Sequence, residues 1–391
     1  MKNIFTIIAL TVLFSMNAQD FWFQGTHNTA IQTINATASG TYSTAMGRST
    51  EASGSRSTAM GASTTASEYA STAMGQSTTA SGFYSTAMGR TTTASGNSST
   101  AMGFETTASG STSTAMGGGT TASGNSSTAM GVDTIASGNA CTAMGEETTA
   151  SGNSSTAMGF RTEASAEHST AMGSETTASG NRSTAMGEST TASGNRSTAM
   201  GTNTEASGKA STAMGSATIA SDFGSTVIGQ YNSSGSTVTN SATAFNAANT
   251  AFVIGNGADG NNISDAFKVM FNGDATLSND LTVEGDIVIS SDARLKANIV
   301  SLGATLARLL LIDGKSYTMK KDGKQKIGVL AQDIQKVFPE LVSTDDRDML
   351  AVNYQGLVPV LINALKEQDG KMKEQEKRLE RLEAIISNMD K

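Results

Sequence analysis

Residues 43–56 read STAMGRSTEASGSR, and close variants of this stretch follow one another through about half of the chain. Thirteen methionines, from Met46 to Met214, stand at intervals of fourteen residues, and Ile228 occupies the next equivalent place. A fixed period over so many copies indicates one small structural unit stacked on itself.

Each unit holds two short segments, STAMG and TEASG, and both end in glycine. Fourteen residues are too few for two helices, so we expect two short strands with a tight turn after each. Residues alternate between the two faces of a strand, which puts Thr44 and Met46 on one face and Ser43 and Ala45 on the other. Stacked units would then form a methionine column with alanine opposite. Variable pairs fall in or beside the turns, among them Arg48-Ser49 and Glu146-Glu147.

A single isolated unit would not be stable, because it buries too little apolar surface. Each buried CH₂ group of its one methionine and two or three alanines contributes about 0.8 kcal/mol, whereas each ordered residue costs roughly 1–2 kcal/mol of backbone entropy. Stacks gain stability from their neighbours and from association. We therefore expect several chains to wind together, with the alanine faces buried between them.

The methionine column has a rival interpretation, because thioethers bind soft metals such as Cu(I). We favour core packing, since no cysteine or histidine column accompanies the methionines and methionine fills narrow cores well. Cys141 stands in the serine place of its repeat, and His27 and His168 are isolated. The sequence therefore predicts no metal site, no cofactor and no catalytic role for these three residues.

Composition excludes other classes of protein. The 391 residues include 41 glycines, two prolines and 5% aromatic residues, which suits a fibrous repeat protein better than a compact enzyme. A net charge of −8 argues against nucleic acid as a partner. Lys2, the apolar run 4–14 and Ala18 predict a secretory signal peptide over residues 1–18. That run is too short to span a bilayer, and no later segment is apolar enough, so we expect a secreted or cell-surface protein without a membrane span.

The repeats resemble the head domains of trimeric autotransporter adhesins, in which units of the form S-V-A-I-G and A-x-G build a trimer. Here STAMG and T-x-A-S-G take those places over residues 37–230, after a lead-in at 19–36. The resemblance implies a mainly β fold, a left-handed parallel β-roll in a homotrimer. No counterpart of the outer-membrane barrel of those adhesins is present, so the resemblance does not extend to their export route.

Residues 231–290 predict a strand-rich neck. The fourteen-residue period stops at residue 231, with one echo at Phe252-Val253-Ile254-Gly255. Short alternating runs follow at 267–271, 275–277 and 281–289, separated by the turn signals Asn272-Gly273 and Glu284-Gly285. We expect this neck to carry the trimer from the roll to the next domain.

At Ser291 the composition changes to charged residues and large aliphatics. The stretch 291–299, SDARLKANI, resembles the start of the self-cleaving intramolecular chaperone domain of phage endosialidase tailspikes. Further matching residues follow in the family's order through residue 355, namely Tyr317, IGVLAQD at 327–333, VFPELV at 337–342 and VNY at 352–354. The resemblance implies a small α+β domain that assists assembly.

The chemistry of this junction involves Ser291 and Lys296, which lie five residues apart and can meet across one turn of chain. A serine hydroxyl needs a base to remove its proton, and a lysine can serve where burial lowers its pKa from about 10.4. The resemblance assigns Ser291 as nucleophile and Lys296 as base, with a single cleavage of the Ser290–Ser291 bond. Spacing alone leaves another interpretation open, in which Ser291 caps a short helix or turn and Lys296 is solvated.

Residues 356–391 predict a parallel trimeric coiled coil. Glutamines at two d positions help fix the register, and RLERLE at 378–383 resembles a trimerisation signal. A solvated helix folded back on its own domain is the alternative. The heptads place Val358, Leu365, Met372, Leu379 and Ile386 at a, and Leu361, Gln368, Gln375, Leu382 and Met389 at d.

The sequence thus predicts a secreted homotrimeric fibre or adhesin with a C-terminal chaperone that cuts itself off, directed at a host-surface, glycan or matrix ligand. The chaperone would set the register, since identical coils could pair one repeat out of step at little local cost. Two other functions remain open. An ice-binding stack would use the threonine columns that begin at Thr44 and Thr50, and a phage-type tail fibre would recognise a host, which the signal peptide disfavours.

Overall fold

The structure is a computed structural model that describes residues 23–25, 30–33, 35–233, 235–236, 238, 240–344 and 348–389. The chain divides between Thr282 and Val283 into two compact units. The predicted signal peptide at 1–18 and His27 lie outside the described residues.

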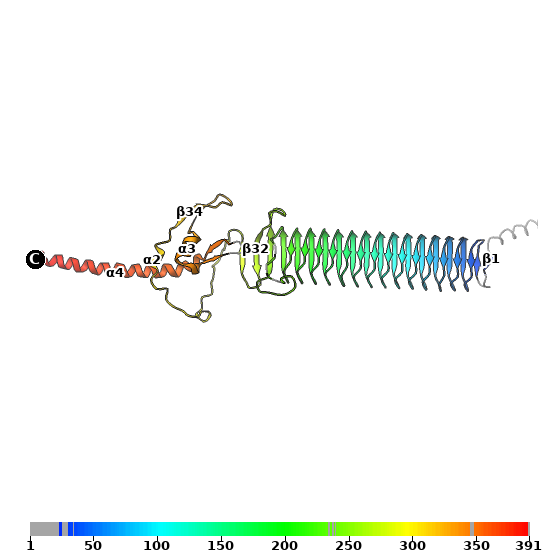
Figure 1. The fold of residues 1–391 in the computed structure, drawn as a ribbon, viewed down its shortest axis with the longest axis horizontal. Coiled ribbons are helices and arrows are strands. Elements are labelled where there is room, and N and C mark those ends of the chain that lie inside the picture. Colours follow the sequence, from blue (N-terminus) through cyan, green and yellow to red (C-terminus); the bar gives the residue numbers. More distant parts are fainter. Residues whose placement is uncertain are drawn as a thin grey trace, which may run out of the picture. The chain divides into compact units, whose positions relative to one another are not determined.

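The repeats form a stack of parallel strands (Figure 1). Each coil has a five-residue strand over its TAMG segment and a two-residue strand over its second segment. Neighbouring coils pair in register, so that Met46 lies opposite Met60 and Ala52 opposite Ala66. The predicted β-roll of two strands and two turns per coil is confirmed.

The long strands are β4 (Thr44–Arg48), β6 (Thr58–Ala62), β8 (Thr72–Gln76), β10 (Thr86–Arg90), β12 (Thr100–Phe104), β14 (Thr114–Gly118), β16 (Thr128–Val132), β18 (Thr142–Glu146), β20 (Thr156–Phe160), β22 (Thr170–Ser174), β24 (Thr184–Glu188), β26 (Thr198–Thr202), β28 (Thr212–Ser216) and β30 (Thr226–Gln230). The short strands are β3 (Thr37–Ala38), β5 (Glu51–Ala52), β7 (Thr65–Ala66), β9 (Thr79–Ala80), β11 (Thr93–Ala94), β13 (Thr107–Ala108), β15 (Thr121–Ala122), β17 (Ile135–Ala136), β19 (Thr149–Ala150), β21 (Glu163–Ala164), β23 (Thr177–Ala178), β25 (Thr191–Ala192), β27 (Glu205–Ala206) and β29 (Ile219–Ala220).

The core of the roll consists of alanine, serine and threonine. Ala45 and Ala52 are 0% exposed, and Ser43 and Thr50 are buried beside them, whereas Met46 is only half-buried. The prediction that methionine shares the core, with alanine faces buried between chains, is therefore wrong. The alanines fill the inside of each chain, and the same core also buries Cys141, Val227 and Val253.

This arrangement also bears on the ice-binding alternative. The threonine column that begins at Thr50 is buried, so it cannot form part of a flat outer surface. The column that begins at Thr44 alternates with the methionines on a half-buried face. A surface of two exposed threonine columns, as that alternative requires, is absent from the described coils.

Glycine at the end of each long strand permits the close stacking of coils. Gly131 has φ +124°, and a Cβ built on it would lie 1.9 Å from the carbonyl oxygen of Gly145 in the next coil. No side chain fits at that distance. The turns tolerate other residues in the left-handed region because the stack supplies a hydrogen bond, as when the Ser63 N–H (φ 57°) donates to the Arg48 carbonyl at 2.9 Å.

The roll continues one coil past the point where the sequence period stops. Strand β31 (Thr250–Asn256) pairs in parallel with β30, which places Ile254 opposite Ile228. The buried carboxylate of Asp222 accepts hydrogen bonds from the Ser236 and Thr250 N–H groups, both at 2.8 Å, and thereby anchors the intervening segment. Burial alone would raise the pKa of Asp222, but these hydrogen bonds lower it overall.

Side-chain amides complete the two ends of the short-strand sheet. At the last strand, Asn232 Oδ1 accepts from the Ile219 N–H at 2.7 Å, and Asn232 Nδ2 donates to the Ile219 carbonyl at 3.0 Å. At the first strand, Gln32 Oε1 accepts from the Ala38 N–H at 2.9 Å. These amides take the hydrogen-bonding positions that a further strand would occupy.

The ends of the long-strand sheet are antiparallel. Strand β2 (Ile31–Gln32) pairs in parallel with β4 and antiparallel with β1 (Phe23–Gln24), and β32 (Asp265–Met270) pairs antiparallel with both β31 and β33 (Ala275–Leu277). The strands expected near 267–271 and 275–277 are therefore present. The strand expected at 281–289 is wrong, because that stretch has no regular structure.

The second unit is a small α+β domain. Strands β34 (Lys315–Thr318) and β35 (Gln325–Gly328) form one hairpin, and β36 (Val342–Thr344) and β37 (Leu350–Val352) form another. Ile334, Phe338 and Val360 are the centre of its core. Its helices are η1 (Ala293–Leu295), α2 (Leu306–Leu309), α3 (Ala331–Val337), η2 (Pro339–Leu341), η3 (Tyr354–Gly356) and α4 (Leu357–Met389). No helix among the described residues has both the length and the apolar composition needed to cross a membrane.

We predict that Gly131→Ala destabilises the roll, whereas Gly118→Ala does not. A Cβ at 131 meets a backbone oxygen and requires a strained φ, at a cost of at least about 2 kcal/mol, whereas nothing lies within 4 Å of a Cβ at 118. Thermal unfolding followed by circular dichroism measures both variants. Equal midpoints for the two would contradict the close-stacking argument.

Candidate functional site

The structure brings Ser291 and Lys296 together. Lys296 Nζ donates a hydrogen bond to Ser291 Oγ at 2.6 Å. The short helix η1 reverses the chain between them, with the Lys296 N–H donating to the Ala293 carbonyl at 3.1 Å. Both side chains are exposed, as is Ser290.

Asp292 and Arg294 hold this turn. Asp292 is the N-cap of η1, and its Oδ1 accepts from the Arg294 N–H at 2.8 Å. The Arg294 guanidinium donates to the same carboxylate, with Nη2 to Oδ2 at 2.7 Å, and this contact holds the pKa of Asp292 below its usual range. The alternative interpretation expected Ser291 to cap a short helix or turn, but Asp292 is the residue that caps η1. The Ser291 hydroxyl instead accepts the hydrogen bond from Lys296.

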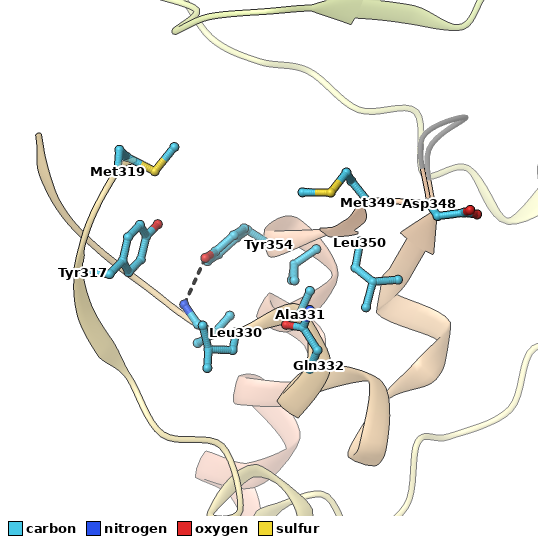
Figure 2. Close-up of a pocket in the computed structure, with 11 residues that line it drawn as sticks. Tyr317, Met319, Leu330, Ala331, Gln332, Asp348, Met349, Leu350 and Tyr354 are labelled. Atoms are coloured by element: carbon cyan, nitrogen blue, oxygen red, sulfur yellow. Dashed lines mark hydrogen bonds between the residues drawn. The ribbon is translucent and has the colours of Figure 1, made fainter. Parts of the chain in front are cut away.

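A groove of about 720 Å³ lies elsewhere in the same unit, between β34, α3 and η3 (Figure 2). The Tyr354 hydroxyl accepts from the Val329 N–H at 3.1 Å at its floor. A Cβ at Gly328 would lie 2.7 Å from that hydroxyl and 3.0 Å from the hydroxyl of Tyr317, so glycine there lets both rings approach the backbone. Tyr317 and Tyr354, two residues of the motifs in this segment, thus line the groove.

Sequence analysis missed a contact that ties α4 to its own domain. The Glu367 carboxylate, on α4, accepts hydrogen bonds from the N–H groups of Thr305 and Leu306 at the start of α2. Thr305 Oγ1 donates to the Val360 carbonyl at 3.1 Å. The first turns of α4 therefore pack on their own domain, as the folded-back alternative expected, but the rest of the helix does not.

The isolated residues His168 and Cys141 lie in the roll. His168 is exposed in a turn, beside Glu167. Cys141 is buried inside its coil, where its Sγ donates to the Ala150 carbonyl at 3.2 Å and burial raises the pKa of the thiol. His168 is thus a surface residue of the roll, and Cys141 packs as the serine whose place it takes.

Comparison with known families agrees with both units. The family model of the YadA head domain repeat matches segments from residue 34 to residue 232, and the family model described as chaperone of endosialidase matches residues 291–343. The chain joins YadA head repeats to a chaperone of endosialidase domain. The match to the chaperone domain begins at Ser291, the residue in contact with Lys296. The repeat segments matched are 34–50, 52–78, 80–106, 108–134, 136–162, 150–176, 164–187, 178–204 and 206–232.

Several phage proteins are similar over part of the chain. The long tail fiber protein Gp37 of Escherichia phage AR1 is 32% identical over 92 residues, which are 21% of this chain and 8% of that protein. The Gp37 of Salmonella phage S16 is 28% identical over 117 residues, 27% of this chain and 16% of that protein. The Gp37 of Enterobacteria phage M1 is 31% identical over 99 residues, 23% and 39% of the two chains. The chain therefore spans less than two fifths of the length of each of these relatives.

We predict that Glu367→Ala loosens α2, whereas Glu374→Ala, farther along α4, does not. The hydrogen bond from the Thr305 N–H is the main cause that holds the pKa of Glu367 below its usual value. The contribution of this contact to stability is therefore complete above the pKa of the unfolded chain and is lost as the pH falls through the lower folded pKa.

Hydrogen exchange at the Leu306 amide measures this effect. We expect several-fold faster exchange in Glu367→Ala at neutral pH and a matching loss of protection for the wild type in acid. Unchanged exchange in Glu367→Ala would contradict the proposed tie between α2 and α4.

Proposed function

We propose that the chain is a secreted homotrimeric fibre whose C-terminal domain acts as an assembly chaperone and then cuts itself off at the Ser290–Ser291 bond. The observation that carries self-cleavage is the contact between Ser291 and Lys296, at the first residue of the chaperone of endosialidase match. The trimer follows from apolar surface that one chain leaves uncovered.

The helix α4 leaves one of these surfaces. All five a positions of the heptad pattern, from Val358 to Ile386, are at least 51% exposed. Exposed aliphatic side chains at a and d are what a coiled coil buries between its chains. The polar d positions Gln368 and Gln375 favour one alignment of the three helices over others. A stack of identical coils cannot select a single alignment of the chains by itself.

The half-buried face of the roll fits the same assembly. Met46 and Thr44 project from the long strand, and in-register pairing repeats them in every coil. Three such columns would bury their thioethers between chains while each chain keeps its alanines inside. This replaces the expected alanine interface with a methionine interface.

Cleavage needs a base and a dry site. A lysine in water is protonated at neutral pH, and burial disfavours its charged form. In the proposed step, neutral Lys296 takes the hydroxyl proton as Ser291 Oγ attacks the Ser290 carbonyl carbon. The Ser290–Ser291 C–N bond breaks, the Ser291 nitrogen receives the proton, and water hydrolyses the resulting ester.

The surroundings of the dyad support a requirement for assembly. Ser291 and Lys296 are exposed in a single chain, and nearby Leu295, Ile299 and Val300 are 68–82% exposed. These aliphatic side chains are suited to contact with neighbouring chains, and the same contact would remove water from the dyad. We propose that cleavage thereby follows correct trimer formation.

We predict that Leu379→Glu shifts the intact chain from trimer to monomer, whereas Ser387→Glu does not. Three carboxylates at one a layer would be buried close together, while position 387 faces solvent at b of the heptad. Sedimentation equilibrium measures the mass of the two variants and the wild type. A monomeric wild type would contradict the trimer proposal.

We predict that purified wild type releases a fragment of residues 291–391 and that Ser291→Ala and Lys296→Arg stay whole. The first variant lacks the nucleophile, and the second carries a guanidinium that cannot accept the proton. Each should slow cleavage by orders of magnitude. Ser301→Ala, at an exposed serine in the same domain, serves as the control and should be cut as the wild type is.

Intact-mass spectrometry of these chains decides the assignment. An uncut wild type in the trimeric state, or a cut Ser291→Ala, would refute the dyad. Leu379→Glu should also remain uncut, because its dyad stays exposed to water.

A further inference from the structure

Aromatic residues gather on one edge of the first coils. Tyr42, Arg56, Tyr69, Phe83 and Tyr84, here named the aromatic edge, occupy the turn that follows the short strand in four successive coils. Hydrogen bonds between coils place them side by side, since the Arg56 N–H donates to the Thr41 carbonyl at 2.7 Å and the Tyr84 N–H donates to the Tyr69 carbonyl at 2.9 Å. Three of the six tyrosines of the chain thus lie in one short patch.

The roll does not need these rings. The same turn positions carry Asn97-Ser98 in the next coil and Asn125-Ser126 and Asn153-Ser154 farther along, with the same backbone conformation. Tyr42, Phe83 and Tyr84 are 61%, 48% and 60% exposed. Contiguous exposed apolar patches on a protein surface mark interaction or ligand-binding sites.

Contacts between side chains hold two of the rings, Tyr69 and Tyr84, in place. Tyr69 and Tyr84 meet edge to face, with ring centroids 5.4 Å apart. The Arg56 guanidinium lies 5.4 Å from the centre of the Tyr69 ring and donates a hydrogen bond to its hydroxyl. A ligand therefore meets a prearranged surface and orders few side chains on binding.

We propose that the aromatic edge binds a linear oligosaccharide of pyranose sugars. The flat rings offer apolar faces for the C–H faces of sugars, and tyrosine hydroxyls and the Arg56 guanidinium offer hydrogen bonds to the sugar hydroxyls. Tyr42 and Tyr84 are three coils apart, or about 14 Å at the usual spacing of strands. A repeating polymer suits a patch that extends along one direction on the outside of a turn.

This inference deepens the proposed fibre function by naming a ligand, and it relies on that function only for the exposure of the roll to such ligands. The test uses the full chain and its Phe83→Asn, Tyr84→Ser double variant, which copies Asn97-Ser98 and should fold. Phe160→Ser, which removes a ring from the other turn of the coil and copies Ser174, is the matched control. Tyr42→Ser is a second variant of the edge.

Isothermal titration calorimetry with tetramers of glucose, N-acetylglucosamine and galacturonic acid measures binding. We expect at least one tetramer to bind wild type and Phe160→Ser alike, and to bind the double variant and Tyr42→Ser at least tenfold more weakly. Binding of none of the tetramers, or undiminished binding by the edge variants, would overturn the proposal.

Sedimentation of the same samples separates this proposal from the fibre proposal. A monomer that binds sugar through the aromatic edge would refute the trimer and leave the sugar site standing. A trimer lost in the edge variants would show that a second copy of the chain covers the edge, and would overturn the sugar site.

Discussion

The carbonyl oxygen at the end of each long strand lies where the side chain of the preceding coil would have to be. At Gly131 this contact would be 1.9 Å from a Cβ, so the position accepts only glycine. Because these glycines carry no side chain, successive coils can stack directly on one another. The glycine in every long strand and the in-register stacking of the coils both depend on this close approach of backbones.

The period and the glycines were enough to predict the roll, its in-register pairing and its turns. The location of the core was not predictable from alternation, because alternation tells which residues share a face and not which face lies inside. Met46 is the larger and more apolar residue, yet Ala45 is the one that is fully buried. Which face lies inside depends on the direction in which the chain closes each coil, and a pattern of apolar residues does not specify that direction.

In the C-terminal domain the short-range contact was predictable and the long-range ones were not. Ser291 and Lys296 are joined by one turn, so their spacing and the motif around them were sufficient. Glu367 accepts a hydrogen bond from Thr305, which is 62 residues away in the sequence. The residues around either position contain no motif that predicts this contact. The contact of Asp222 was equally unpredictable. Asp222 occupies a glycine position of the repeat, and its carboxylate accepts a hydrogen bond from Thr250, which lies 28 residues farther along the chain.

The two units differ in how much apolar surface they leave exposed. Each coil of the roll buries its own small side chains and is closed by its neighbours, whereas the second unit exposes more large aliphatic side chains than it buries. A domain with this balance has apolar surface available for contact with a partner, and any partner that binds only the folded domain would stabilise it. Such a domain is suited to act while chains come together.

The ends of the roll carry a further consequence. A stack of in-register parallel strands has the geometry by which amyloid fibrils recruit new chains at an open edge. Here Gln32 and Asn232 fill the hydrogen-bonding positions at the two ends of one sheet, and antiparallel hairpins finish the other. The number of coils therefore follows the number of repeats in the sequence, and the side-chain amides at the ends of the short-strand sheet hinder the addition of a strand from another chain.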